Sequence, residues 1–179
     1  MHNYTISIGR ETDEEFVSYP FSYETTVKLS AAELWQALLN EFKDYKQGWM
    51  WPTQYSQPTV DQFPPRKGGL FILTYQMPDP RDPDKPKQNL TYDFEILDIR
   101  ETEAERYLDY GSGNHHPFLG GGRISVTPAD DGYSQLQWKG VYKFRLEKKH
   151  REEAGQIFSY YFPMFFNGFS ENIKNKIGY

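Results

Sequence analysis

Apolar and polar residues alternate along most of the middle of the chain. Between residues 133 and 146, Leu, Trp, Tyr and Phe side chains occupy even positions, while Gln, Lys and Arg side chains occupy odd ones. A period of two is the pattern of a strand with one buried face. The same kind of pattern predicts seven strands, at 19–29, 59–63, 70–77, 89–100, 106–110, 123–128 and 133–146.

Helical spacing follows the first predicted strand. Ser30 and Glu33 form a capping box, in which each side chain satisfies an amide donor at a helix start, and apolar residues recur on one stripe from 34 to 42. We expect a short second helix or turn within 43–56. A long Gly-rich turn is predicted at 111–122.

The last predicted element is a long helix from about 148 to 177, and its centre is unusually aromatic. Seven of the thirteen residues at 157–169 are Phe or Tyr, so rings surround the helix nearly completely. Such a helix is either buried on two sides or partly covered by a ligand or a partner chain. Three interpretations stay open, namely an aromatic core, a ligand-lined cavity, and a homodimer or membrane-touching surface. Pro163 either bows the helix or begins a new one.

Composition and charge narrow the class of protein. A length of 179 residues suits one domain, 1–179, with the polar residues 1–15 as a flexible lead-in. The net charge of −5, with one dense basic run at 148–151, argues against nucleic acid as a partner. The absence of cysteine excludes disulfides and Cys-ligated metals. With no secretory signal and no apolar span of ~20 residues, we expect a cytoplasmic protein without an integral membrane segment.

Two adjacent histidines are the first candidates for chemistry. His115 and His116 lie in the Gly-rich turn, and no third ligand follows at metal spacing, so we expect no metal and no cofactor. His115 suits general acid–base catalysis because the ordinary pKa of histidine lies near ~6.5, although a surface histidine explains it more simply. The glycines lack the strand–loop–helix context of a phosphate or dinucleotide site, and there is no serine-hydrolase elbow.

Two arginines and a tyrosine complete the candidates for catalysis. Arg106 and Arg123 are the best candidates for a buried charge, and an inward arginine would bind a carboxylate or enolate oxygen. The strand pattern leaves the face of Arg123 open. Tyr142 lies on the predicted inner face and is the third catalytic candidate beside His115 and Arg123. Whether the chain is an enzyme stays open.

Aromatic residues with polar tips mark the predicted inner face of the sheet. Buried tyrosine hydroxyls need partners, so they would either offer oriented hydrogen bonds to an amphipathic ligand or reach water at a cavity mouth. The candidate ligand-binding residues are Phe71, Tyr75, Met77, Tyr92, Phe94, Tyr110, Trp138, Tyr142, Phe158, Phe162, Phe165 and Phe169.

The segments LSAAELWQALL, GGLFILTY, TYDFEIL and DDGYSQLQWKG, followed by the apolar terminal helix, resemble the START/polyketide-cyclase (SRPBCC) superfamily. This is the helix-grip fold also seen in birch-pollen-type allergens, and the resemblance covers residues 19–177. It implies an α+β fold, a curved antiparallel sheet of six or seven strands wrapped around a long C-terminal helix, with two short helices after the first strand. The longer Pro-rich loop at 78–87 and Pro163 depart from the pattern.

The resemblance also implies a range of functions. Our main expectation is a binding protein for a small hydrophobic or amphipathic ligand, such as a lipid, an aromatic or a polyketide-like molecule, in a cavity between sheet and helix. One alternative is a polyketide cyclase or dehydratase that uses the same cavity. Another is a protein-docking module of the chaperone-activator type. Fold alone does not choose among them, because one fold serves many functions.

Overall fold

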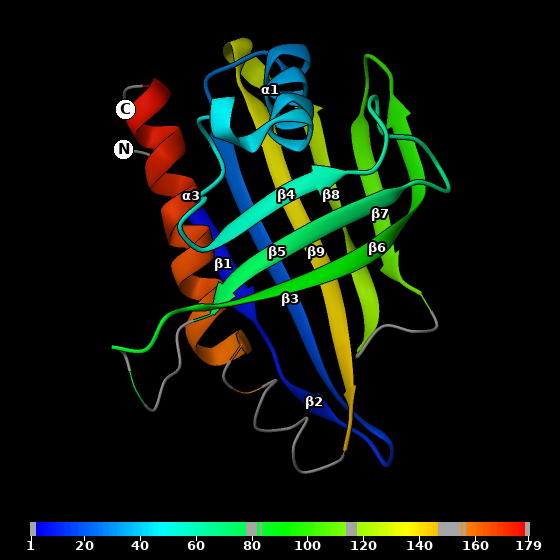
Figure 1. The fold of residues 1–179 in the computed structure, drawn as a ribbon. Helices are drawn as coiled ribbons and strands as arrows, with labels where there is room; N and C mark the ends of the chain where they lie inside the picture. The colour runs from blue at the N-terminus through cyan, green and yellow to red at the C-terminus, as the bar shows by residue number, and fades with distance from the viewer. Residues whose placement is uncertain are drawn as a thin grey trace.

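The computed structural model describes residues 3–77, 82, 84–113, 118–146, 155 and 157–177 (Figure 1). Within these residues, nine strands form one antiparallel sheet and two α-helices pack against it. The strands are β1 (Tyr4–Ile8), β2 (Glu11–Thr12), β3 (Phe16–Val27), β4 (Ser56–Val60), β5 (Leu70–Met77), β6 (Gln88–Glu101), β7 (Arg106–Ser112), β8 (Leu119–Pro128) and β9 (Ser134–Arg145). The helical elements are α1 (Ala31–Lys43), single 3₁₀ turns at Tyr45–Gln47 and Asp130–Gly132, a π-helical turn at Ile157–Tyr161, and α3 (Phe162–Ile177).

The sheet is strongly curled. Its strand order is β1-β3-β9-β8-β7-β6-β5-β4, with β2 paired to β3. In Figure 1 the strands β4, β5 and β6 cross the direction of β3, β9 and β8, so the sheet bends round on itself. Helix α3 lies along β1 and β3, and α1 contacts β4, β8 and β9 at one end. One hydrophobic cluster joins the inner face of the sheet to both helices. The predicted α+β arrangement is therefore confirmed.

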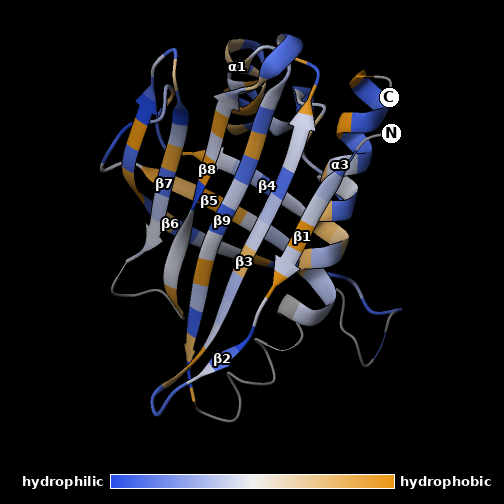
Figure 2. Cartoon of the chain, turned by 180° about the vertical axis from the view of Figure 1, so that it is seen from behind, coloured by the Kyte–Doolittle hydropathy of each residue, from blue (hydrophilic) through white to orange (hydrophobic). Residues whose placement is uncertain are grey.

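Strand alternation was predicted correctly for the central strands. Along β9 the even positions from Ser134 to Phe144 are buried wherever they carry a side chain, and bands of opposite hydropathy mark this strand in Figure 2. In β6, Phe94 and Ile96 are buried while their neighbours are exposed. A register shift between Ile96 and Asp98 then interrupts the regular pairing of β6 with β7.

Three boundaries differ from the predictions. Residues 4–12, expected as a flexible lead-in, form β1 and β2, because Tyr4, Ile6 and Ile8 alternate and pack against the core as an edge strand. The glycines at 120–122, expected in a turn, lie within β8. Strands β1 and β2 bring the sheet to nine strands rather than six or seven. Strand β4 starts and ends three residues earlier than the predicted strand at 59–63.

The first helix begins where its capping box predicted. The Ser30 amide donates to the Glu33 carboxylate (3.0 Å) and the Glu33 amide donates to the Ser30 hydroxyl (3.3 Å), which satisfies two free donors of the first turn. The stripe from 34 to 42 is buried at Leu34, Leu38 and Phe42. The expected second short helix is a single 3₁₀ turn.

The terminal helix changes type at its proline. Pro163 is the second residue of α3, and α3 begins directly after the π-helical turn. The local change in hydrogen-bond spacing accommodates a residue that lacks an amide hydrogen. Three side-chain hydrogen bonds then fix α3, from Asn167 onward, to the rest of the molecule. They join Tyr4 to Asn167 (2.7 Å), Tyr23 to Ser170 (2.8 Å) and the Asn172 amide group to the Met50 carbonyl (3.2 Å).

Candidate functional site

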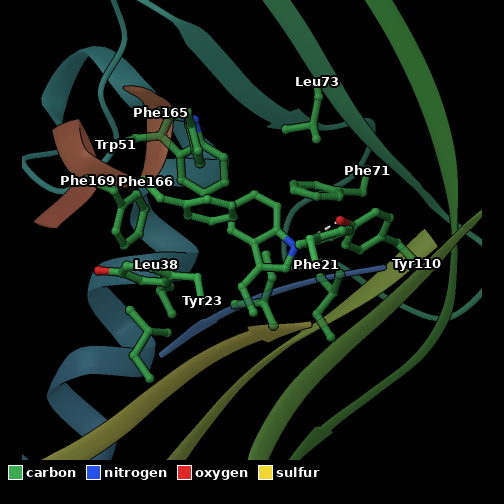
Figure 3. Close-up of a cluster of buried hydrophobic side chains, with 14 of the residues drawn as sticks. Phe21, Tyr23, Leu38, Trp51, Phe71, Leu73, Tyr110, Phe165, Phe166 and Phe169 are labelled. Atoms are coloured by element: carbon green, nitrogen blue, oxygen red, sulfur yellow. Dashed lines mark hydrogen bonds between the residues drawn. The ribbon is translucent and has the colours of Figure 1, made fainter. Parts of the chain in front are cut away.

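The space between the sheet and α3 contains mostly aromatic side chains. Trp51 lies 5.6 Å from both Phe165 and Phe169, measured between ring centroids (Figure 3). Trp138 also lies 5.6 Å from Phe165. All three ring pairs meet edge to face, an arrangement that favours aromatic contacts. The rings of α3 therefore cover the inner face of the sheet directly.

A chain of polar groups runs through this aromatic interior. The Trp138 indole N–H donates to the Tyr110 hydroxyl (2.8 Å), and the Tyr110 and Tyr142 hydroxyls are 2.8 Å apart. A dashed line in Figure 3 ends at the Tyr110 hydroxyl, where these bonds meet. The Tyr142 hydroxyl interacts electrostatically in turn with that of Tyr75. We call Trp138, Tyr110, Tyr142 and Tyr75 the polar chain. All four side chains are at least nine-tenths buried.

Glycines on β8 make this chain possible. Strand β8 lies between β7, which carries Tyr110, and β9, which carries Tyr142. Tyr110 faces Gly122 across one strand pair, and Tyr142 faces Gly120 across the other. A Cβ atom on Gly122 would lie 2.8 Å from the Tyr110 hydroxyl oxygen. The two tyrosines reach each other across β8 because no side chain stands between them.

Burial keeps the tyrosines of the polar chain neutral. It raises the pKa of Tyr110, and the hydrogen bonds with Tyr142 and Trp138 offset only part of that effect. It also raises the pKa of Tyr75 and Tyr142 well above their ordinary value of 10.0. These phenols stay protonated at neutral pH. They can donate and accept hydrogen bonds, but they are poor general bases.

A buried glutamate positions Trp51 in the wall of the site. The Glu41 carboxylate oxygen Oε1 accepts hydrogen bonds from the amides of Trp49 (2.8 Å), Met50 (2.6 Å) and Trp51 (3.4 Å). A Cβ on Gly48 would fall 1.8 Å from the other oxygen, Oε2, so only glycine fits there. Burial raises the pKa of Glu41, and the three amide bonds counteract that shift in part.

Most of the predicted ligand-binding residues come together. Nine of the twelve are buried members of one cluster, and Tyr92 is half-buried beside Tyr75. The side chains of Met77 and Phe158 lie outside the described residues, and so does His115. The nine are Phe71, Tyr75, Phe94, Tyr110, Trp138, Tyr142, Phe162, Phe165 and Phe169.

Arg123 lies on the outer face of the sheet, which removes it from the interior candidates. Its side chain is half exposed and forms a two-point ion pair with Asp109, with Nη2 2.7 Å from Oδ2. The guanidinium also stacks 4.0 Å from the Tyr107 ring centroid. Ile124 and Val126 occupy the inward positions of β8, so a partner for Arg123 had to come from the same outer face. Arg106 is buried, but away from the polar chain.

Several residues of the site were not predicted from the sequence. Trp51 belongs to an irregular segment, so no periodic pattern marked it. Tyr23 is stacked 4.9 Å from Phe166 and hydrogen bonded to Ser170, although its place in the alternation of the strand at 19–29 could have identified it. Gly120 and Gly122 were assigned to a turn. Their spacing to the two tyrosines becomes meaningful only once the strand register is known.

Within the described residues, no group of three or more His, Asp or Glu side chains is placed to hold a metal ion. In the same part of the chain, no helix combines the length and the apolar character needed to span a bilayer.

Comparisons with known proteins give matches in structure alone. No family model matches the chain, and no curated protein matches its sequence. Human StAR-related lipid transfer protein 5 is similar over 96% of this chain and 86% of its own, with 10% identity and a TM-score of 0.56. Norcoclaurine synthase from Thalictrum flavum is similar over 94% of both chains, with 11% identity and a TM-score of 0.54. The lipid transfer and protein localization domain of human StarD13 is similar over 96% of this chain and 89% of its own, with 10% identity and a TM-score of 0.54. Such low identities establish a shared fold only.

Proposed function

We propose that this chain, which has the helix-grip fold of the START/polyketide-cyclase superfamily, binds one small amphipathic molecule between the curled sheet and α3. The observation that carries the proposal is the polar chain, four hydrogen-bonding groups in an otherwise aromatic interior. Sparse polar groups within apolar walls are the usual composition of small-molecule sites. Two of the similar structures are named for lipid transfer, which supports an apolar guest of this kind.

The polar chain favours a guest with one hydroxyl or carbonyl group. Each phenol can accept and donate, so one bond within the chain can be exchanged for a bond to the guest without leaving a buried group unpaired. The remainder of the guest has to be a ring or an acyl chain, because rings and aliphatic side chains line the rest of the space. The rings now contact one another, with Phe94 5.0 Å from Tyr110, so binding has to move some of them apart.

The cyclase-type alternative requires a group that exchanges protons near neutral pH. Tyr142 does not suit this role because burial raises its pKa. Arg123 lies on the outer face in an ion pair with Asp109. We therefore propose binding rather than catalysis for the described interior.

Pairs of probes that differ by one hydroxyl test the proposal. The pairs are naphthalene with 2-naphthol, and decane with decanol, titrated into the protein and followed by native mass spectrometry and Trp fluorescence. We expect one bound molecule, and binding of each hydroxylated probe about two- to twelvefold tighter than that of its partner, since one hydrogen bond contributes about 0.5–1.5 kcal/mol.

Two variants locate the binding site. Tyr142→Phe removes a hydroxyl from the polar chain and should abolish most of the preference for the hydroxylated probe. Tyr107→Phe is the matched control, because it removes a hydroxyl that is bonded to Asp98 on the outer face (2.7 Å). Failure of the folded protein to take up any of the four probes would refute the proposal, and so would an unchanged preference in Tyr142→Phe.

A further inference from the structure

A hollow that is open to solvent lies outside the interior, at the end of the sheet where α1 begins. It has a volume of about 330 Å³ and is lined by the first residues of α1, the start of β7 and the turn between β8 and β9. Figure 1 shows α1 and that turn at the same end of the sheet. The residues that matter are Ala31 and Ala32 of α1, Arg106 of β7, and Glu103 and Tyr133 at the edge of the hollow.

Arg106 brings a buried positive charge to this hollow. The residue is only 9% exposed, and its Nε and Nη1 atoms are fully buried without a hydrogen-bond partner among the described residues. A buried guanidinium is costly unless it is paired and hydrogen bonded. Glu103 lines the same hollow but is exposed and forms no ion pair with Arg106 in the described part of the chain. Within the residues that the structure describes, the charge of Arg106 thus lacks a counter-ion.

The start of α1 adds a second positive feature. The capping box uses the amides of Ser30 and Glu33. The amides of Ala31 and Ala32 belong to the first turn, whose N–H groups have no acceptor within the helix. These N–H groups and the helix dipole attract anions. Because alanine has no side chain beyond Cβ, an anion in the hollow can approach this turn closely.

We propose that this hollow binds the oxyanion of a small phosphorylated or carboxylated molecule, held by the Arg106 guanidinium and the amides of Ala31 and Ala32. Guanidinium groups and helix starts both match the oxygens of phosphate and carboxylate. The volume accommodates more than the anion itself, since a water molecule occupies roughly 30 Å³ in the liquid and the hollow has a volume of about 330 Å³. The site is separate from the polar chain and does not depend on the function proposed for it.

Isothermal titration calorimetry tests this site with three probes: inorganic phosphate, phenyl phosphate and benzoate, each against sodium chloride at equal ionic strength. We expect saturable binding of at least one probe, with phenyl phosphate tighter than inorganic phosphate if the organic part also contacts the hollow. Comparison of phenyl phosphate with benzoate separates a phosphate site from a carboxylate site. Absence of binding by all three probes overturns the proposal.

Substitutions in α1 keep the test independent of folding defects. Ala32→Glu places a carboxylate at the mouth of the hollow, and an acidic residue in the first turn suits a helix, so the variant should fold and bind at least tenfold more weakly. Asn40→Asp changes the net charge equally but lies about 12 Å further along the helix axis, so it should bind like the parent. Arg106→Met should also lose binding. Unchanged affinity in Ala32→Glu overturns the proposed site even where Arg106→Met fails to fold.

Discussion

Replacing Glu41 by alanine tests how the wall of the aromatic interior is held in place. The Glu41 carboxylate accepts the amides of Trp49, Met50 and Trp51 on one oxygen. Alanine removes that acceptor without offering another, and the irregular segment 48–51 has no strand or helix ladder to replace it. We expect Trp51 to lose its fixed position and the protein to lose stability.

The size of the loss follows from the three hydrogen bonds. Two are short, 2.8 and 2.6 Å, and the third, 3.4 Å, is at the limit of a hydrogen bond. Leaving a buried amide unpaired costs about 1–3 kcal/mol, so two such amides cost about 2–6 kcal/mol. Relief of the unfavourable burial of the carboxylate offsets part of this. We expect Glu41→Ala to lower the free energy of unfolding by about 2–4 kcal/mol.

Glu41→Gln is the informative companion variant. It keeps a carbonyl acceptor for the same amides, so its loss should be less than half that of Glu41→Ala. Gln36→Ala changes an exposed residue of the same helix and should stay within about 0.5 kcal/mol of the parent. Urea unfolding followed by circular dichroism measures all three. If Glu41→Ala matched the Gln36→Ala control, or if Glu41→Gln lost as much as alanine, the reasoning would be refuted.

The pH dependence of the same variants gives an independent check. Burial raises the pKa of Glu41 in the folded state, so folding favours the protonated acid. The corresponding stability is present below the unfolded pKa, about 4.3, and is lost as the pH rises through the folded value. The parent should therefore lose stability relative to Glu41→Gln between pH 4 and neutrality. A gain over that interval would contradict the assigned direction.

Two further substitutions probe the frame of the fold. Ser30→Ala removes the N-cap of α1 and should lower the free energy of unfolding, measured in urea, by about 0.5–2 kcal/mol. An unchanged free energy would mean that water satisfies the amides of the first turn equally well. Gly121→Ala would place a Cβ 2.0 Å from the Tyr110 carbonyl oxygen, a backbone atom. Strands β7 and β8 then have to separate, and the free energy of unfolding should fall by about 1–3 kcal/mol or more. Gly113→Ala, where the added Cβ meets nothing within 4 Å, is its control, and equal stability of the two glycine variants would contradict the close strand approach.

The sequence predicted those elements whose pattern depends on residues close together in the chain. The capping box at Ser30 depends on residues three apart, and the alternation along β9 depends on one strand with one buried face. Both patterns were sufficient to place their elements. The edge strand β1 was missed because its alternation spans only five residues beside an acidic stretch, and its stability comes from pairing with β3.

The candidate site was harder to predict because its contacts depend on strand register. The sequence identified Tyr110, Trp138 and Tyr142 as inward residues, but their mutual bonds require two glycines on the strand between them. A run of glycines usually marks a turn, so the pattern favoured the wrong element. The direction of Arg123 followed the alternation of β8 and became clear only once its neighbours were seen to be buried.

The attachment of α3 differs along its length. Among the described residues of this helix, side-chain hydrogen bonds come from Asn167, Ser170 and Asn172, all of which follow residue 166. The first turn, 162–166, is attached through ring contacts, which weaken gradually with displacement, whereas hydrogen bonds are lost over a fraction of an ångström. The end of the helix that contains Pro163 can therefore move away from the sheet at a lower free-energy cost than the part around Ser170.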